Sequence, residues 1–300
     1  MILSALGKLG TSIKLLNPLL NPVLISNVVS IWSLSFKELI NPDIFSIFKF
    51  SFTNNSIYAF FDLDETLMFD GVISQENIDA LKKAQEKGHE IFLSTGRTKG
   101  FLPSEVNKIN FDGYLLASSY IEYKNEVLFA SYLEDETIQI CLSLIKKSRG
   151  GANFEGENAY FDITEEMIKD LSEEEFDELI SSFDFRKAKI SKVTFHYKLN
   201  PKEEASIEEL EKVFFSYKTE CVHKGNTKGN LIKKFGSIIK VTKDNFIVFG
   251  DSENDVSMFN VVQNNIAICP SSKKIRNMAR LIIFKKENGV AIALETLGLI

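Results

Sequence analysis

Two acidic residues, Asp62 and Asp64, stand directly after a short apolar run of the sequence. The run, residues 57–61, is rich in β-branched and aromatic side chains, which is typical of a strand buried on both faces of a parallel sheet. Side chains two positions apart in an extended segment project to the same side, so both carboxylates can face one site. Such carboxylates can serve as a nucleophile, as a general acid and base, or as ligands of a hard cation. Taken alone, the same pair could simply cap a following helix.

Two further apolar runs also end in polar residues. Residues 90–93 lead into Ser94, Thr95, Gly96 and Arg97, and residues 245–249 lead into Gly250, Asp251, Ser252, Glu253, Asn254 and Asp255. In open parallel α/β sheets, ligands bind at the carboxyl ends of the strands, so we expect the three segments to meet at that edge. Carboxylates gathered there would repel one another without a cation. Hard divalent cations, which prefer oxygen ligands, fit best, and Mg²⁺ needs only a few carboxylates together with substrate phosphate.

The residues between the first two runs predict a helix that completes a β-α-β unit. Ser74 is a typical N-cap, residues 75–87 carry apolar side chains at a spacing of three, and Gly88 is typical of a helix end. Residues 266–269 and 281–284 are short apolar runs that predict additional strands of the same sheet.

The middle of the chain follows another pattern. Ser172 with Glu175, and Ser206 with Glu209, fit the capping box that opens a helix. Residues 192–197 alternate like a strand with one exposed face. These features predict an α+β insert with one solvated sheet face, placed between two halves of a core.

Composition narrows the class of protein. The chain has 300 residues, of which 44% are hydrophobic and 25% charged, as in ordinary soluble globular proteins and unlike multi-span membrane proteins. Its net charge of −6 argues against a nucleic acid polymer as partner. Three scattered cysteines, without a C-x-x-C pair, argue against a disulfide framework or a structural zinc site.

Residues 1–56 form an apolar extension of unknown role. Residues 15–36 carry no charge, and about 20 apolar residues suffice to cross a bilayer. Pro18 and Pro22 interrupt this stretch, and a proline inside a helix costs about 3 kcal/mol. Three interpretations stay open: a segment packed on the core or lying on a membrane surface, a membrane anchor, and a cleaved signal. We expect a cytoplasmic protein, with membrane association through residues 1–56 as the alternative.

Four motifs in order carry a resemblance to a known family. They are Asp62-Leu63-Asp64-Glu65-Thr66, Ser94-Thr95-Gly96-Arg97, Lys228-Gly229, and Gly250-Asp251-Ser252-Glu253-Asn254-Asp255. Between about Tyr58 and Leu297 the chain resembles the haloacid dehalogenase-like phosphohydrolases, specifically their Cof-type branch, subclass IIB. This resemblance implies an α/β fold with a Rossmann-like parallel sheet core and an inserted α+β cap domain. The core would comprise residues 57–121 and 219–300, and the cap residues 122–218.

The resemblance also implies roles for individual residues. Asp62 would be the nucleophile and Asp64 the general acid and base. Thr95, Lys228 and Asn254 would hold the phosphoryl oxygens. Mg²⁺ would bind Asp62, the backbone carbonyl of Asp64 and Asp251, with Asp255 as an alternate or supporting ligand. Lys224, which also precedes a glycine, is the alternative to Lys228.

The implied function is a Mg²⁺-dependent phosphatase that acts through an aspartyl-phosphate. Its partner would be a small phosphorylated metabolite, such as a sugar phosphate, a nucleotide or a cofactor phosphate. A phosphomutase or phosphotransferase uses the same motifs and stays open. A non-catalytic, membrane-associated binding protein is the third interpretation, and the presence of both Asp62 and Asp64 argues against it. Ala117-Ser118-Ser119-Tyr120 stands where this branch often has Asn-Gly just before the cap, which leaves the substrate preference open.

Overall fold

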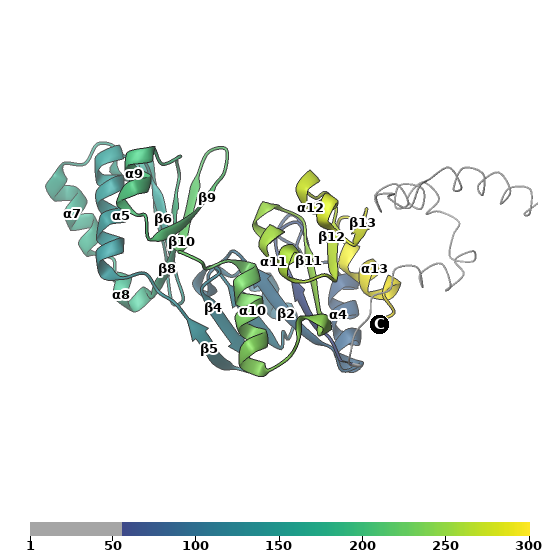
Figure 1. Ribbon diagram of the computed structural model, residues 1–300. Coiled ribbons are helices and arrows are strands. Elements are labelled where there is room, and N and C mark those ends of the chain that lie inside the picture. The colour runs from purple at the N-terminus through teal and green to yellow at the C-terminus, as the bar shows by residue number, and fades with distance from the viewer. Residues whose placement is uncertain (1–55) are drawn as a thin grey trace, which may run out of the picture.

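A computed structural model describes residues 56–300, which form two sheets with helices packed on them (Figure 1). Neighbouring strands of the larger sheet run parallel, apart from the last two, which continue it antiparallel. Its eight strands follow the order β13 (Leu281–Ile283), β12 (Asn265–Ile268), β11 (Phe246–Gly250), β1 (Tyr58–Phe61), β2 (Glu90–Thr95), β3 (Gly113–Leu116), β4 (Tyr120–Tyr123) and β5 (Glu126–Ala130). The predicted α/β class is confirmed.

Helices cover both faces of this sheet, as the alternation of side chains along β1 requires. Phe61 packs in the apolar cluster under α4 (Gln75–Glu86) and α13 (Gly289–Thr296). Phe60 packs on the other face, under α10 (Lys228–Ile239), α11 (Val256–Val261) and α12 (Lys273–Met278). Burial of each phenylalanine side chain contributes about 2 kcal/mol to the free energy of unfolding. Short 3₁₀ turns complete the core: η2 (Lys99–Phe101), η3 (Ser104–Lys108), η4 (Lys243–Asn245) and η5 (Glu253–Asp255).

The smaller sheet is antiparallel and belongs to the insert, residues 135–223. Its five strands follow the order β7 (Tyr160–Ile163), β6 (Ala152–Gly156), β8 (Ile190–Phe195), β10 (Thr219–His223) and β9 (Leu210–Phe214). The insert's helices are α5 (Asp135–Ser148), α6 (Glu165–Ile168), α7 (Glu173–Ser181), α8 (Phe185–Ala188) and α9 (Pro201–Ser206). In Figure 1 the insert lies beside the larger sheet, with α5 and α7 on its far side.

Local signals in the sequence predicted some of these elements. The side chain of Ser74 accepts a hydrogen bond from the backbone N–H of Asn77, as expected of the α4 N-cap. Ser172 and Glu175 form the predicted capping box of α7. The prediction of a helix opening at Ser206 is wrong, because Ser206 is the last residue of α9. That helix opens instead at Asn200, followed by a proline that suits the first turn.

The predicted solvated face of the insert is also wrong at β8. Lys192 and Thr194 are only 7% and 4% exposed, although both lie on the polar side of an alternating strand. Lys192 faces the larger sheet instead of solvent, since its Nζ donates a hydrogen bond to the carbonyl of Gly96 at 3.1 Å, and the hydroxyl of Thr194 donates to Glu155 within the insert. The alternation therefore marks a polar interface between the two sheets.

The sheets also divide the chain at different places from the predicted boundaries. Residues 126–130, expected in the cap, form β5 of the larger sheet, and residues 219–223, expected in the core, form β10 of the smaller one. The connection from β4 to β5 runs through Lys124 and Asn125 at φ 51° and 65°. Two consecutive residues with positive φ are typical of a tight hairpin turn, which keeps β5 paired with β4.

Among residues 56–300, no helix has both the length and the apolar character needed to cross a bilayer. The three interpretations of the N-terminal extension concern residues 1–55, which lie outside the described residues.

Candidate active site

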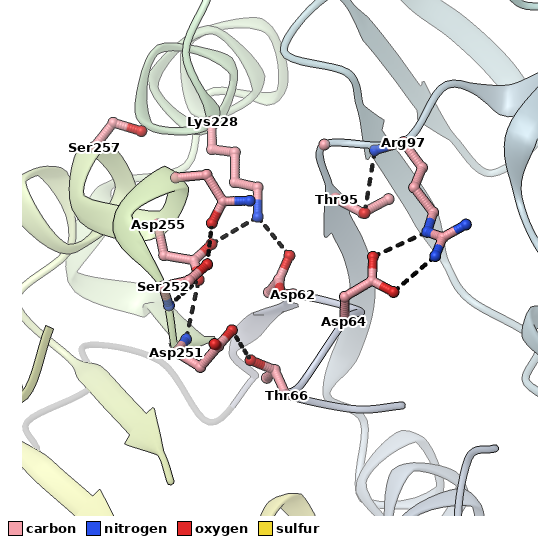
Figure 2. Close-up of polar contacts among 12 residues, drawn as sticks. Asp62, Asp64, Thr66, Thr95, Arg97, Lys228, Asp251, Ser252, Asp255 and Ser257 are labelled. Carbon is pink, nitrogen blue, oxygen red and sulfur yellow. Dashed lines mark hydrogen bonds and ion pairs between the residues drawn. The ribbon is translucent and has the colours of Figure 1, made fainter. Parts of the chain in front are cut away.

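Asp62 and Lys228 form the centre of a buried charge cluster at the carboxyl edge of the larger sheet (Figure 2). Asp62 follows β1, and its backbone N–H donates to the carbonyl of Phe249 on β11, which fixes its position. Lys228 Nζ lies 2.5 Å from Asp62 Oδ1 and 2.6 Å from Asp255 Oδ1. All three side chains are almost fully buried. The lysine therefore joins the ends of β1 and β11 at one point.

The turn after β11 brings Asp251 and Asp255 to the same place. Asp255 Oδ2 accepts hydrogen bonds from the backbone N–H groups of Asp251 and Ser252, at 3.0 and 3.2 Å. Asp251 Oδ1 accepts from the hydroxyl of Thr66 at 3.1 Å. A Cβ at position 250 would lie 2.6 Å from the Asp255 carboxyl group, so only glycine permits this turn.

Lys228 is the first residue of α10, and the start of this helix fixes its position. Thr227 caps the helix by accepting from the backbone N–H of Asn230. A Cβ on Gly229 would lie 2.2 Å from the carbonyl oxygen of Ser257, so the glycine allows α10 to approach α11 closely. Lys224, the alternative considered from the sequence, is exposed and lies outside the cluster.

The cluster holds more negative charge than its lysine compensates. Burial and the neighbouring charges of Asp255 and Asp251 raise the pKa of Asp62 well above its usual range, although Lys228 opposes them. Burial and Asp255 raise the pKa of Asp251 to about 7. Burial by itself would lower the pKa of Lys228, but Asp255 and Asp62 together raise it. The site therefore favours binding of a proton or a cation.

The donor set suits a hard divalent cation. Asp62, Asp251 and Asp255 present carboxylate oxygens within 4.8 Å of one another. Both oxygens of Asp255 already accept hydrogen bonds, whereas Asp62 and Asp251 each keep one carboxylate oxygen without a hydrogen-bond donor among residues 56–300. Asp62 and Asp251 are therefore the better candidate ligands, and Asp255 supports the turn and orients Lys228. The side chain of Asp64 lies outside this group.

Asp64 is instead held by Arg97, which follows β2 (Figure 2). The guanidinium donates from Nε to Asp64 Oδ2 at 2.9 Å and from Nη2 to Oδ1 at 2.8 Å. This bidentate contact fixes the plane of the Asp64 carboxylate. The Asp64 side chain is 49% exposed, unlike the buried Asp62 beside it, so it stays accessible to a substrate.

The other predicted phosphate ligands border the same edge. Thr95 is the last residue of β2, and its hydroxyl oxygen accepts from the backbone N–H of Arg97 at 3.2 Å. Asn254 Oδ1 accepts from the hydroxyl of Ser252, and a Cβ at Gly96 would lie 3.8 Å from Asn254 Nδ2. The two segments that carry Thr95 and Asn254 therefore face each other.

A cavity of about 290 Å³ opens at this edge, between the larger sheet and the insert. From the larger domain, Gly96, Lys228 and Asn254 line it, and from the insert, Lys192 and Glu220 line it. Lys192 lies 3.4 Å from Glu155 and 3.2 Å from Glu220, so its charge is compensated inside the insert. The cavity is large enough for a small metabolite.

Sequence reasoning missed three parts of this arrangement. It assigned no hydrogen-bond donor to Asp251, although the hydroxyl of Thr66, a residue of the first motif, donates to it. It gave no role to Lys192, because only the register of β8 and its placement over the larger sheet show that this residue is buried. It left the role of Arg97 undecided, since its contact with Asp64 joins two separate strand ends.

Comparison with known proteins agrees with this geometry. Residues 59–294 match the family described as haloacid dehalogenase-like hydrolases. The chain belongs to this family. The candidate phosphatase MG263 of Mycoplasma genitalium is 23% identical over 238 residues, which cover 69% of this chain and 80% of that protein.

Solved structures of haloacid dehalogenase-like hydrolases share the fold. The subclass IIB sugar phosphatase BT4131 superposes with a TM-score of 0.65 at 23% identity, covering 81% of this chain and all of that structure (100%). A Cof-like hydrolase from Plasmodium vivax gives a TM-score of 0.66 at 19% identity, covering 85% of this chain and 99% of that one. The predicted resemblance to the haloacid dehalogenase-like hydrolases is confirmed by the family match, and these structures share the fold of the chain.

Proposed function

We propose that this haloacid dehalogenase-like hydrolase is a Mg²⁺-dependent phosphatase of a small phosphorylated metabolite. The observation that carries the proposal is the position of Asp62, buried at a strand end between Lys228 and the carboxylate of Asp251. A carboxylate fixed beside a lysine and a cation site can attack a phosphoryl group, because the positive charges offset the repulsion between two anions. The sugar phosphatase among the related structures supports this class of activity.

In the proposed reaction an Asp62 oxygen forms a bond to phosphorus while the bond from phosphorus to the ester oxygen breaks. The Asp64 carboxyl group gives its proton to that departing oxygen. Asp64 then takes a proton from water, whose oxygen attacks phosphorus and releases Asp62 and inorganic phosphate. Lys228, Thr95 and Asn254 would hold the phosphoryl oxygens.

Asp62 and Asp251, with the backbone carbonyl of Asp64, would hold Mg²⁺, and Asp255 would support them. When bound, the ion neutralises the negative charge shared by these carboxylates and the phosphoryl group. The insert, acting as a cap, would exclude water from the cavity and select the leaving group.

The direct test is phosphate release from a panel of phosphorylated metabolites, measured with Mg²⁺ and with EDTA. We expect release from at least one sugar, nucleotide or cofactor phosphate, and loss of that release in EDTA. Release that is unaffected by EDTA would contradict the metal dependence. Transfer of phosphate to added sugar in preference to water would instead indicate a phosphomutase or phosphotransferase.

We also expect stabilisation by Mg²⁺ to grow between pH 5.5 and pH 7.5. Asp251 titrates near pH 7 in the folded protein and near pH 4 in an unfolded chain, so the metal-free fold is stabilised by a bound proton below pH 4. This contribution is lost as the pH rises through about 7. A cation that replaces the proton therefore neutralises more uncompensated negative charge at pH 7.5 than at pH 5.5.

The measurement is the melting temperature in Mg²⁺ and in EDTA at both pH values. Asp251→Asn is the matched control and should lose most of the Mg²⁺-dependent rise. An equal rise at both pH values in the wild type would show that protons and Mg²⁺ do not compete at this cluster.

A further inference from the structure

The segment from Gly96 to Phe101 is the place where the insert touches the residues that hold Asp64. The ring of Phe101 stacks on the ring of Tyr160, the first residue of β7, with centroids 4.4 Å apart and planes 9° from parallel. Gly100 lies against the backbone of the insert, because a Cβ there would be 2.9 Å from the carbonyl oxygen of Gly156. The insert and this segment therefore pack closely, with one aromatic stack and one backbone contact between them.

The same segment contains Arg97, whose guanidinium binds the carboxylate of Asp64. The Arg97 guanidinium carbon lies 5.0 Å from the centre of the Phe101 ring, within the range of a cation–π contact. Its Nη1 donates to the carbonyl of Phe101 at 3.5 Å, while Nε and Nη2 hold Asp64. Phe101 thus has Arg97 as one neighbour and Tyr160 as another.

A second contact from the insert reaches the residue before Arg97. Lys192 Nζ donates to the carbonyl of Gly96 at 3.1 Å and is itself buried between Glu155 and Glu220. The insert thereby contacts both neighbours of Arg97. Lys192 binds the backbone of the preceding residue, and Tyr160 stacks on the ring against which the guanidinium packs. An arginine fixed in this way loses less conformational freedom when it grips a carboxylate.

We propose that the insert positions Asp64 for proton transfer through the stack Tyr160–Phe101–Arg97. Tyr160 and Phe101 are positioning residues, since neither touches the carboxylate. The inference rests on the proposed function, because it concerns the proton that Asp64 gives to the departing ester oxygen. Proton transfer by a well-placed group contributes about 10²–10⁴ in rate, and a displaced donor loses part of this.

The leaving group separates a proton-transfer role from a general structural one. An alkyl phosphate such as glycerol 1-phosphate releases an alkoxide that needs a proton, whereas p-nitrophenyl phosphate releases a stable phenolate that does not. We expect Tyr160→Ala to lower kcat/KM about tenfold on glycerol 1-phosphate and less than about threefold on p-nitrophenyl phosphate. The ratio kcat/KM reports the steps up to the aspartyl-phosphate, in which Asp64 gives its proton to the departing oxygen, and excludes the later attack of water, which is the same for both esters.

Tyr160→Phe is the matched control, because it keeps the stacked ring. The Tyr160 hydroxyl forms no hydrogen bond within residues 56–300, so this variant should match the wild type on both esters. Phe101→Ala serves as a second variant if Tyr160→Ala perturbs the insert. Phe101 is 36% exposed and lies outside the insert, so its loss should leave the insert folded.

A double-mutant cycle tests whether Tyr160 acts through Arg97. If it does, Tyr160→Ala combined with Arg97→Ala should be no slower on glycerol 1-phosphate than Arg97→Ala alone. Equal losses on both esters, or additive losses in the double variant, would overturn the inference and leave the proposed function intact. If glycerol 1-phosphate is a poor substrate, the best alkyl phosphate of the metabolite panel takes its place. A wild-type protein that hydrolyses no phosphate ester of the panel would overturn the proposed function and this inference with it.

Discussion

Replacing Asp62 with asparagine is expected to lower kcat at least a thousandfold while the protein keeps its fold. The substitution removes the attacking oxygen, and loss of a covalent nucleophile costs several orders of magnitude. The fold should survive, because asparagine has nearly the same volume and the site already disfavours a charge on Asp62. The melting temperature of the metal-free variant should equal or exceed that of the wild type.

Steady-state kinetics on the best substrate of the panel, together with thermal melts in EDTA, check both parts. Asp244→Asn is a matched control of the same chemistry on the surface of the larger domain, and its activity should not change. If Asp62→Asn kept more than about a tenth of the wild-type rate, Asp62 would not be the nucleophile.

The second large effect is expected at Lys228. Lys228→Met keeps a long apolar side chain but leaves Asp62 and Asp255 without their shared cation. Removing one partner of a buried charge cluster costs about 3–5 kcal/mol of the free energy of unfolding. Loss of a positive group aimed at the phosphoryl oxygens should lower kcat/KM by a further factor of about 10²–10³.

The loss in the free energy of unfolding that Lys228→Met causes should depend on pH. Without the lysine, the carboxylates can lower their charge only by taking up protons, so the loss should be smaller at pH 5 than at pH 7.5. Chemical denaturation at the two pH values measures this difference. Lys224→Met is the matched control, because Lys224 is exposed and also precedes a glycine. Equal stability losses in the two lysine variants would contradict the assignment of Lys228 to the cluster.

The sequence predicted the edge of the sheet where the acidic residues lie, because that edge follows from local patterns. Asp62, Thr95 and Asp251 each follow a short apolar run, and parallel strands bring their carboxyl ends together. The backbone alone therefore places these three positions near one another. No side-chain geometry had to be known for this part.

The contacts that depend on side-chain rotamers and on docking could not be predicted. The grip of Arg97 on Asp64 needs both side chains to reach across two strand ends. The burial of Lys192 depends on a contact between residues 96 positions apart in the chain. The capping-box pattern at Ser206 failed because another capping box, formed by Asn200 and Glu203 and followed by Pro201 in the first turn, opens the helix six residues upstream.

The most direct test of the proposed mechanism is to trap the phosphorylated enzyme. The protein would be mixed with its best substrate and Mg²⁺, quenched in acid within one turnover, and treated with borohydride. Borohydride reduces an aspartyl-phosphate to homoserine and leaves an ordinary aspartate unchanged, so peptide mass spectrometry can locate the reacted residue. We predict homoserine at position 62 in the wild type and none in Asp62→Asn. Homoserine at another aspartate, or none at position 62 while phosphate is being released, would contradict nucleophilic attack by Asp62.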